Sequence, residues 1–210
     1  MTSSTRIASL LCSRLCHDLV GPIGALNNGV ELLEDDDDPE LRRQALDLLG
    51  DSAGEALRRL TFFRLAFGMA GGFGDAIGLS ELRKAAAGLF TQGRTRLDWP
   101  ETAPGAPAGL PKLQARLLLN LVLVAASCLP KGGVLSVAVA GDAVATITAS
   151  GPGARLEAET AEALTGRLTD EQLDPRSVVS HLLATLAAEG GVRLETKTGE
   201  GLLYFTLRWH

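Results

Sequence analysis

The stretch that decides the fold runs from residue 16 to residue 33, CHDLVGPIGALNNGVELL, and is followed at 34–39 by EDDDDP. Apolar or small residues recur in it at steps of three and four, at Cys16, Leu19, Ile23, Leu26, Val30 and Leu33. This heptad spacing predicts a long helix with one apolar seam. Asp38 and Pro39 then suit the N-cap and the first position of a second helix.

The second helix has a seam of its own, at Leu46, Leu49, Ala53, Ala56, Leu60, Phe63 and Phe67. We expect each helix to have about thirty residues and a length of roughly 45 Å. Joined by a short acidic turn, the two helices form an antiparallel hairpin, which by itself cannot cover both seams. Pairing with a second copy would give a four-helix bundle, so we predict a homodimer. The alternative is a monomer in which the hairpin packs on the rest of the chain.

Glycines at 71, 72, 74 and 78 mark a boundary between two domains, at residues 1–72 and 73–210. The second domain mixes helical and strand patterns and so belongs to the α/β class. Helices are expected at 79–90, with Ser80 as a cap, and at 112–129, 156–164 and 175–189. Strands are expected at 95–99, 134–140, 143–149, 192–197 and 202–209, with a tight turn at Gly141 and Asp142.

Composition excludes several classes of protein. The 210 residues include 25 acidic side chains against 20 Lys and Arg, and this net charge of −5 argues against a nucleic-acid binder. The longest uncharged apolar stretch, between Arg116 and Lys131, is shorter than the about 20 residues that a membrane span needs. Three cysteines, an odd number, without a recognisable export signal favour reduced thiols. We therefore expect a cytoplasmic protein with no nucleic-acid or membrane partner.

His17 directly follows Cys16, the first residue of the first seam, and is therefore expected on the solvent side of its helix. The face that it shares at helical spacing holds Arg14, His17, Gly21, Gly24 and Asn28. Gly21 and Gly24 bracket Pro22, and the three together cost about 5 kcal/mol of helix propensity. A purely structural helix has no reason to accept that cost. The glycines leave a bare strip that the backbone of another protein could approach.

The chemistry of this face suits a nucleophile that acts on a macromolecule. An imidazole nitrogen is nucleophilic near neutral pH. Asp18 could orient the ring and raise its basicity. Arg14 could pair with a transferring phosphoryl group, or could be an ordinary solvated arginine. The spacing of Cys12 and Cys16 fits neither haem attachment nor zinc, so we expect core packing for both and no metal site.

Residues 14–22, RLCHDLVGP, resemble the phosphoacceptor box of histidine kinases. His17, Asp18, Leu19 and Pro22 stand where that box has its histidine, acidic residue, apolar residue and proline. Together with FRLAFG at 63–68, the box is similar to the alphaproteobacterial histidine phosphotransferases, which are related to those kinases. This resemblance implies that the hairpin forms a dimeric four-helix bundle with His17 as its phosphoacceptor.

The second domain is similar to the ATP-binding α/β sandwich of histidine kinases. Its nucleotide site is degenerate, at Asn120, Val124, Ala149, Gly151 and Gly153. Val124 stands where the kinases have a magnesium-binding asparagine, and Ala149 where they have an adenine-binding aspartate. Residues 174–177, DPRS, have no glycine where a phosphate loop is expected. The resemblance thus implies that the domain keeps the fold and binds neither ATP nor any other cofactor.

The function implied is a phosphorelay. His17 would take a phosphoryl group from the phospho-aspartate of a hybrid kinase's receiver domain and pass it to the aspartate of a second response regulator. Mg²⁺ would sit in the partner receiver. The residues expected to dock a receiver are Leu19, Gly21, Pro22, Gly24, Asn28 and Arg64. The alternatives are an active histidine kinase, a dimeric receiver-binding scaffold without catalysis, or a phosphatase acting on the receiver.

Overall fold

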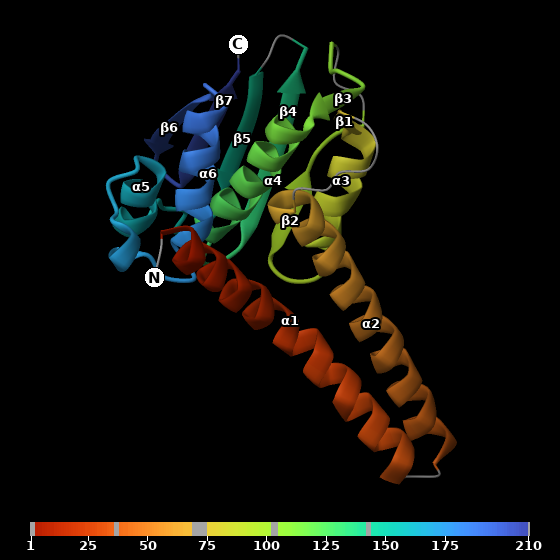
Figure 1. The fold of residues 1–210 in the computed structure, drawn as a ribbon. Coiled ribbons are helices and arrows are strands. Elements are labelled where there is room, and N and C mark those ends of the chain that lie inside the picture. Colours follow the sequence, from red (N-terminus) through yellow and green to blue (C-terminus); the bar gives the residue numbers. More distant parts are fainter. Residues whose placement is uncertain (1–2, 36–37, 69–74, 102–104, 142–143, 210) are drawn as a thin grey trace.

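The structure is a computed structural model that describes residues 3–35, 38–68, 75–101, 105–141 and 144–209. Two long helices, α1 (Ser3–Asp35) and α2 (Pro39–Phe67), form a hairpin that projects from an α/β body (Figure 1). Asp38 caps α2 as predicted, since its Oδ1 accepts a hydrogen bond of 2.8 Å from the backbone N–H of Glu40. Pro39 takes the first helical position, where a missing N–H costs nothing.

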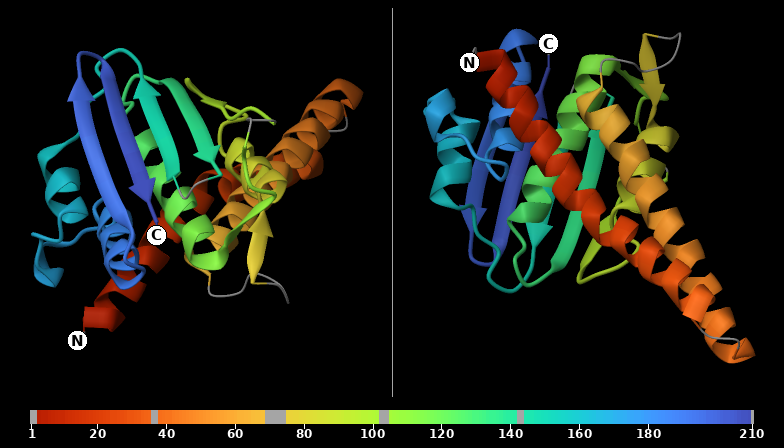
Figure 2. Two further views of the ribbon diagram at one scale, coloured as in Figure 1. Left: turned by 90° about the horizontal axis from the view of Figure 1, so that it is seen from above. Right: turned by 60° about the horizontal axis from the view of Figure 1, so that its bottom comes forward.

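The body is built on a five-stranded mixed sheet in the order β2-β4-β5-β7-β6, with α4 and α6 on one face (Figure 2). Its helices are α3 (Leu79–Gly88), α4 (Lys112–Ser127), α5 (Ala158–Leu164), the 3₁₀ turn η1 (Asp170–Gln172) and α6 (Val178–Glu189). The strands of the sheet are β2 (Thr95–Asp98), β4 (Gly133–Ala140), β5 (Val144–Ser150), β6 (Arg193–Gly199) and β7 (Leu202–Arg208). Only β2 and β4 run parallel, and the other neighbours are antiparallel.

The main differences from the expected elements lie in short segments. Two strands were not expected, β1 (Ala76–Gly78) and β3 (Gly109–Pro111), which pair with each other antiparallel. Each has three residues, too few to show a strand period in the sequence. Ser80 does not cap α3, because Gly78 holds the N-cap position. Of the turn expected at Gly141 and Asp142, Asp142 lies outside the described residues.

One hydrophobic core joins the hairpin to the body. The last turns of α2 bury Phe62, Phe63 and Ala66 against α4, and the first half of α1 packs against the same core through Ile7, Leu10, Leu11 and Leu15. The guanidinium of Arg6 also donates to the backbone carbonyls of Asp170, Glu171 and Leu173. The hairpin is thus fixed to the body through both of its helices (Figure 2).

Each seam of the hairpin is only half covered in the single chain. Leu49, Ala56 and Phe63 are half-buried or buried, whereas Leu46 and Leu60 are 60% and 50% exposed. On α1, Ile23 and Val30 are 53% and 45% exposed. We call the exposed half of the seams the apolar stripe; it consists of Cys16, Ile23, Val30, Leu46, Ala53 and Leu60. Its members recur every seven residues, so they form one line along each helix.

Candidate functional site

His17 lies near the middle of α1, after the residues up to Leu15 that pack against the core, and it lines a hollow together with residues of α2. Its side chain is 84% exposed, as the sequence predicted. Asp18 beside it is only 14% exposed. One carboxylate oxygen of Asp18 lies 3.1 Å from Nδ1 of His17, and the other accepts a hydrogen bond of 2.9 Å from Nε of Arg14. Asp18 therefore contacts both His17, the candidate nucleophile, and Arg14.

This contact decides which ring nitrogen of His17 can react. A carboxylate only accepts hydrogen bonds, so Nδ1 must carry the proton that Asp18 receives. The lone pair of the neutral ring is then on Nε2, which lies on the exposed side chain. A positive charge that forms on the ring during reaction would be stabilised by the same carboxylate. The arrangement fits an exposed imidazole nucleophile with an oriented ring.

Two hollows border His17. The first, the α2-side hollow, has a volume of about 340 Å³ and is lined by His17, Asp18, Gly21, Pro22, Ala25, Ser52, Glu55 and Arg59. Within it, Nε and Nη2 of Arg59 donate to one carboxylate oxygen of Glu55, at 2.9 and 2.6 Å. Neither of these α2 residues was expected at the site from the sequence. Their spacing of four shows an ion pair on a helix, but only the register of the hairpin places that pair beside His17.

The second, the body-side hollow, has a volume of about 400 Å³ and is lined by Ser13, Arg14, His17, Asp18, Asp174, Pro175 and Arg176. Its far wall is the loop before α6, the segment in which a phosphate loop was expected to be degenerate. The oxygen Oδ1 of Asp174 accepts hydrogen bonds of 2.7 Å from the backbone N–H groups of Arg176 and Ser177. These bonds stabilise the turn at 175–177, and α6 begins after it at Val178, with Ser177 at the N-cap, rather than at residue 175.

The predicted docking strip is open. A Cβ atom added at Gly21 or Gly24 would meet no heavy atom within 4 Å, and Asn28 is exposed on the same face. The other expected docking residues lie differently: Pro22 is buried beneath the strip, and Leu19 is half-buried. Arg64 is exposed on α2 and lines neither hollow. A docking role for these residues stays a prediction.

Of the residues expected in the degenerate nucleotide site, three are buried and two are glycines of a turn. Asn120 is fully buried, and its side-chain amide donates to the carbonyls of Ala66 and Arg116, both at 2.8 Å, which ties α4 to α2. Val124 and Ala149 are also buried. Gly151 lies against the Gly132–Gly133 turn, where a Cβ atom would come within 2.4 Å of the Gly132 carbonyl. Gly153 has a φ of +71°, which favours glycine at this turn.

The cysteines lie differently from what was expected. Cys12 and Cys16 are exposed in the single chain, so neither packs in the core of a monomer, and only Cys128 is buried. Burial raises the pKa of Cys128 to about 11, which keeps it a thiol at neutral pH. Among the described residues, no group of three or more His, Cys, Asp or Glu could hold a metal ion. Nor is any helix in that part of the chain long and apolar enough to cross a bilayer.

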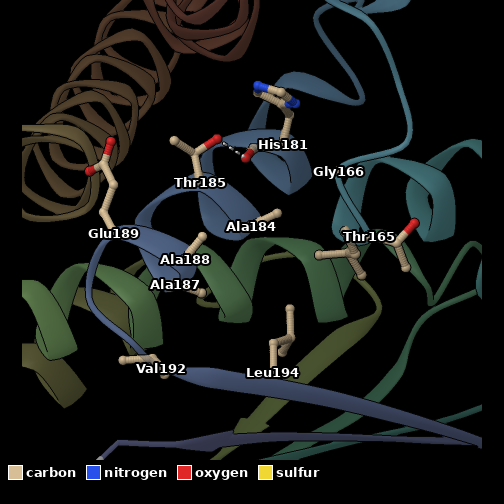
Figure 3. Close-up of a pocket in the computed structure, with 11 residues that line it drawn as sticks. Thr165, Gly166, His181, Ala184, Thr185, Ala187, Ala188, Glu189, Val192 and Leu194 are labelled. Atoms are coloured by element: carbon tan, nitrogen blue, oxygen red, sulfur yellow. Dashed lines mark hydrogen bonds between the residues drawn. The ribbon is translucent and has the colours of Figure 1, made fainter.

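A third hollow, of about 560 Å³, lies between α5, α6 and β6, away from His17 (Figure 3). Its walls are mostly small or apolar side chains, such as Ala184, Ala187 and Val192. His181 lies at one end, and its backbone carbonyl accepts a hydrogen bond of 3.0 Å from the Thr185 hydroxyl. The lining shows no pair of groups suited to acid–base or nucleophilic chemistry.

Comparison with known proteins finds relatives along nearly the whole chain. Residues 79–201 match the family described as "Histidine phosphotransferase C-terminal domain". The chain is 35% identical over 206 residues to Protein phosphotransferase ChpT of Brucella abortus (strain 2308), covering 96% of this chain and 95% of that protein. It also resembles the solved "1.7 Angstrom Structure of a Bacterial Phosphotransferase", with a TM-score of 0.81 and 32% identity over 99% of this chain and 98% of that one.

Proposed function

Because this chain belongs to the family of ChpT-type histidine phosphotransferases, we propose that it relays a phosphoryl group between two receiver domains through His17. The observation that carries the proposal is the arrangement of Arg14, Asp18 and His17 on α1. It combines an exposed imidazole, a nearly buried carboxylate that orients it, and an arginine within reach of a phosphoryl group. The open backbone at Gly21 and Gly24 lets a partner approach the ring.

In the first half-reaction, Nε2 of His17 attacks the phosphorus of a receiver's phospho-aspartate. The N–P bond forms, the P–O bond to the aspartate breaks, and the aspartate leaves as a carboxylate. The proton stays on Nδ1, so the phosphorylated ring is cationic and Asp18 faces that charge. The second half-reaction reverses these steps with the aspartate of another receiver. Positioning and charge neutralisation supply most of the catalysis in such transfers.

The family resemblance suggests the partners of this chemistry. The donor is the receiver domain of a hybrid histidine kinase, and the acceptor is the receiver of a response regulator. Mg²⁺ is supplied by the receiver. We further propose that the apolar stripe is covered in a homodimer, because Ile23, Leu46 and Leu60 are all at least half exposed in the single chain.

The proposal includes the loss of ATP binding by the body. The backbone N–H groups of Arg176 and Ser177, at the start of α6, are used by Asp174 and are not available to a phosphate. Asn120 uses its amide to join two helices. Both observations favour a relay over the alternative of an active histidine kinase.

The decisive experiment is phosphoryl transfer from a purified, radiolabelled phospho-receiver to this protein. We expect label on the wild type and on His181→Ala, whose histidine lies in the third hollow, and none on His17→Ala. A parallel sample with labelled ATP alone should stay unlabelled. Label from ATP alone would identify a kinase instead. Tight receiver binding without any transfer would identify a scaffold.

A further inference from the structure

Three arginines surround His17, and they differ in what their guanidinium groups contact. Arg14 donates to Asp18, and Arg59 donates twice to Glu55. Arg176, on the body-side wall, is exposed and makes no side-chain hydrogen bond or ion pair with the described residues. Its guanidinium is therefore the one of the three that makes no hydrogen bond to a carboxylate of the described residues, although its charge acts on the nearby Asp174.

The loop that carries Arg176 is held in place from two sides. Asp174 accepts three hydrogen bonds on one oxygen, from the backbone N–H of Arg176 and from the backbone and hydroxyl of Ser177. Burial alone would raise the pKa of Asp174, but these bonds and the charge of Arg176 lower it. Arg6 of α1 binds the carbonyl of Leu173, one residue before the loop. Helix α1 thus sets where Arg176 lies relative to His17.

We propose that Arg176 binds the phosphoryl group carried by His17, so that the body supplies one wall of the transfer site. This inference rests on the proposed function and deepens it. A phosphoryl group on Nε2 carries up to two negative charges, and an arginine is the side chain best suited to bind its oxygens. Arg176 is the donor available for this on the body side, because Asp174 occupies the backbone N–H groups beside it.

The two carboxylates of the body-side hollow do not oppose this role. Asp18 is bound by Arg14 and faces the Nδ1 proton of His17. Asp174 directs its Oδ1 into the turn before α6. Each negative charge is therefore directed toward a donor of its own, and the phosphoryl oxygens are left to Arg176 and to the remaining N–H groups of Arg14.

The test separates the phosphoryl group from the protein that delivers it. Phosphoramidate donates its phosphoryl group to an imidazole and releases ammonia, and it is too small to need a docking surface. Wild type, Arg176→Gln, Arg176→Lys and His17→Ala are incubated with it, and phosphohistidine is followed by ³¹P NMR. Arg167→Gln is the matched control, because Arg167 is exposed on the same body and lines neither hollow beside His17. The same variants are then assayed with a phospho-receiver.

We expect Arg176→Gln to slow labelling by about tenfold with both donors, which is the effect of one charge-assisted hydrogen bond. Arg176→Lys should recover part of the rate, Arg167→Gln should match the wild type, and the ³¹P resonance of phosphohistidine should shift only in the Arg176 variants. Equal rates for Arg176→Gln and wild type, with His17→Ala unlabelled, would overturn the inference and leave the relay intact. Slowing with the receiver alone would also overturn it, since Arg176 would then serve docking. No labelling of wild type by either donor would contradict the relay itself.

Discussion

Asp18 is the residue on which the geometry of the site depends. Each of its two oxygens faces a different partner, His17 and Arg14, and its side chain is nearly buried. A carboxylate in this place fixes the ring's tautomer and would stabilise the cation that the proposed phosphorylation creates. An amide of the same shape has one accepting oxygen, so it cannot accept from both His17 and Arg14, and it carries no charge to stabilise the cation.

We therefore expect Asp18→Asn to slow phosphoryl transfer from a receiver by about a hundredfold, within the range for loss of acid–base support. Stability should change much less than the rate. Asp47→Asn is the control, because Asp47 is exposed on α2 away from both hollows. Rates measured by single-turnover transfer, together with Tm, check this. A normal rate in Asp18→Asn would show that the ring needs no carboxylate.

At the scale of single elements, the hairpin leaves on each helix a line of apolar side chains that no other described element covers. Val30 and Leu32 show the contrast, because both are 45% exposed on α1 but only Val30 belongs to the apolar stripe. Two residues further along, Leu32 lies about 200° around the helix. Val30 and Leu32 thus lie on different faces of α1 but are equally exposed. Substitutions at the two positions therefore test whether the apolar stripe forms the dimer interface.

Val30→Glu should shift the protein from dimer to monomer in sedimentation velocity, because a charge would be buried in the stripe's interface. Leu32→Glu should leave the dimer intact. The two variants should show similar helicity. If wild type sediments as a monomer, or if both variants remain dimers, the stripe is not the interface between copies.

The turn before α6 gives a second test at this scale. The pKa of Asp174 is lowered below its ordinary value of 3.8, so its bonds stabilise the fold above that pH and are lost as the pH falls through the lower folded value. We expect Asp174→Ala to cost about 1 kcal/mol at pH 7, the usual net contribution of a side-chain hydrogen bond to the backbone. The difference from wild type should shrink below about pH 4 in urea melts. A difference independent of pH would mean that the carboxylate charge is not what stabilises the turn before α6.

At the scale of the whole molecule, local patterns were readable from the sequence and long-range neighbours were not. The hairpin, His17 and Asp18 follow from helical periodicity and a short motif. Arg59 and Arg176 reach His17 only through the register of α2 and the packing of the body on α1. No pattern within either segment reports such contacts. The exposure of Cys16 in the single chain could not be read from the sequence for a related reason, since a heptad seam does not say which of its positions the second helix of the hairpin covers.

The same scale decides whether the body still binds nucleotide. A ligand that binds only the folded state must raise the Tm. Because we propose that the body does not bind ATP, we expect Mg²⁺-ATP to leave the Tm unchanged up to millimolar concentration. Differential scanning fluorimetry with ADP and GTP as further samples checks this. A rise in Tm that grows with ATP concentration would support the alternative that the protein is an active histidine kinase.

Helix α1 is fastened to the body near Arg6 and to α2 beyond His17, so the histidine lies between two anchored segments. In the proposed relay the receiver domains must therefore bind and dissociate in turn, while His17 stays in the same position. Both half-reactions are bimolecular in that case. The rate of phosphoryl flow through the relay would depend on the copy numbers of donor and acceptor receivers in the cell. If the acceptor were scarce, His17 would remain phosphorylated.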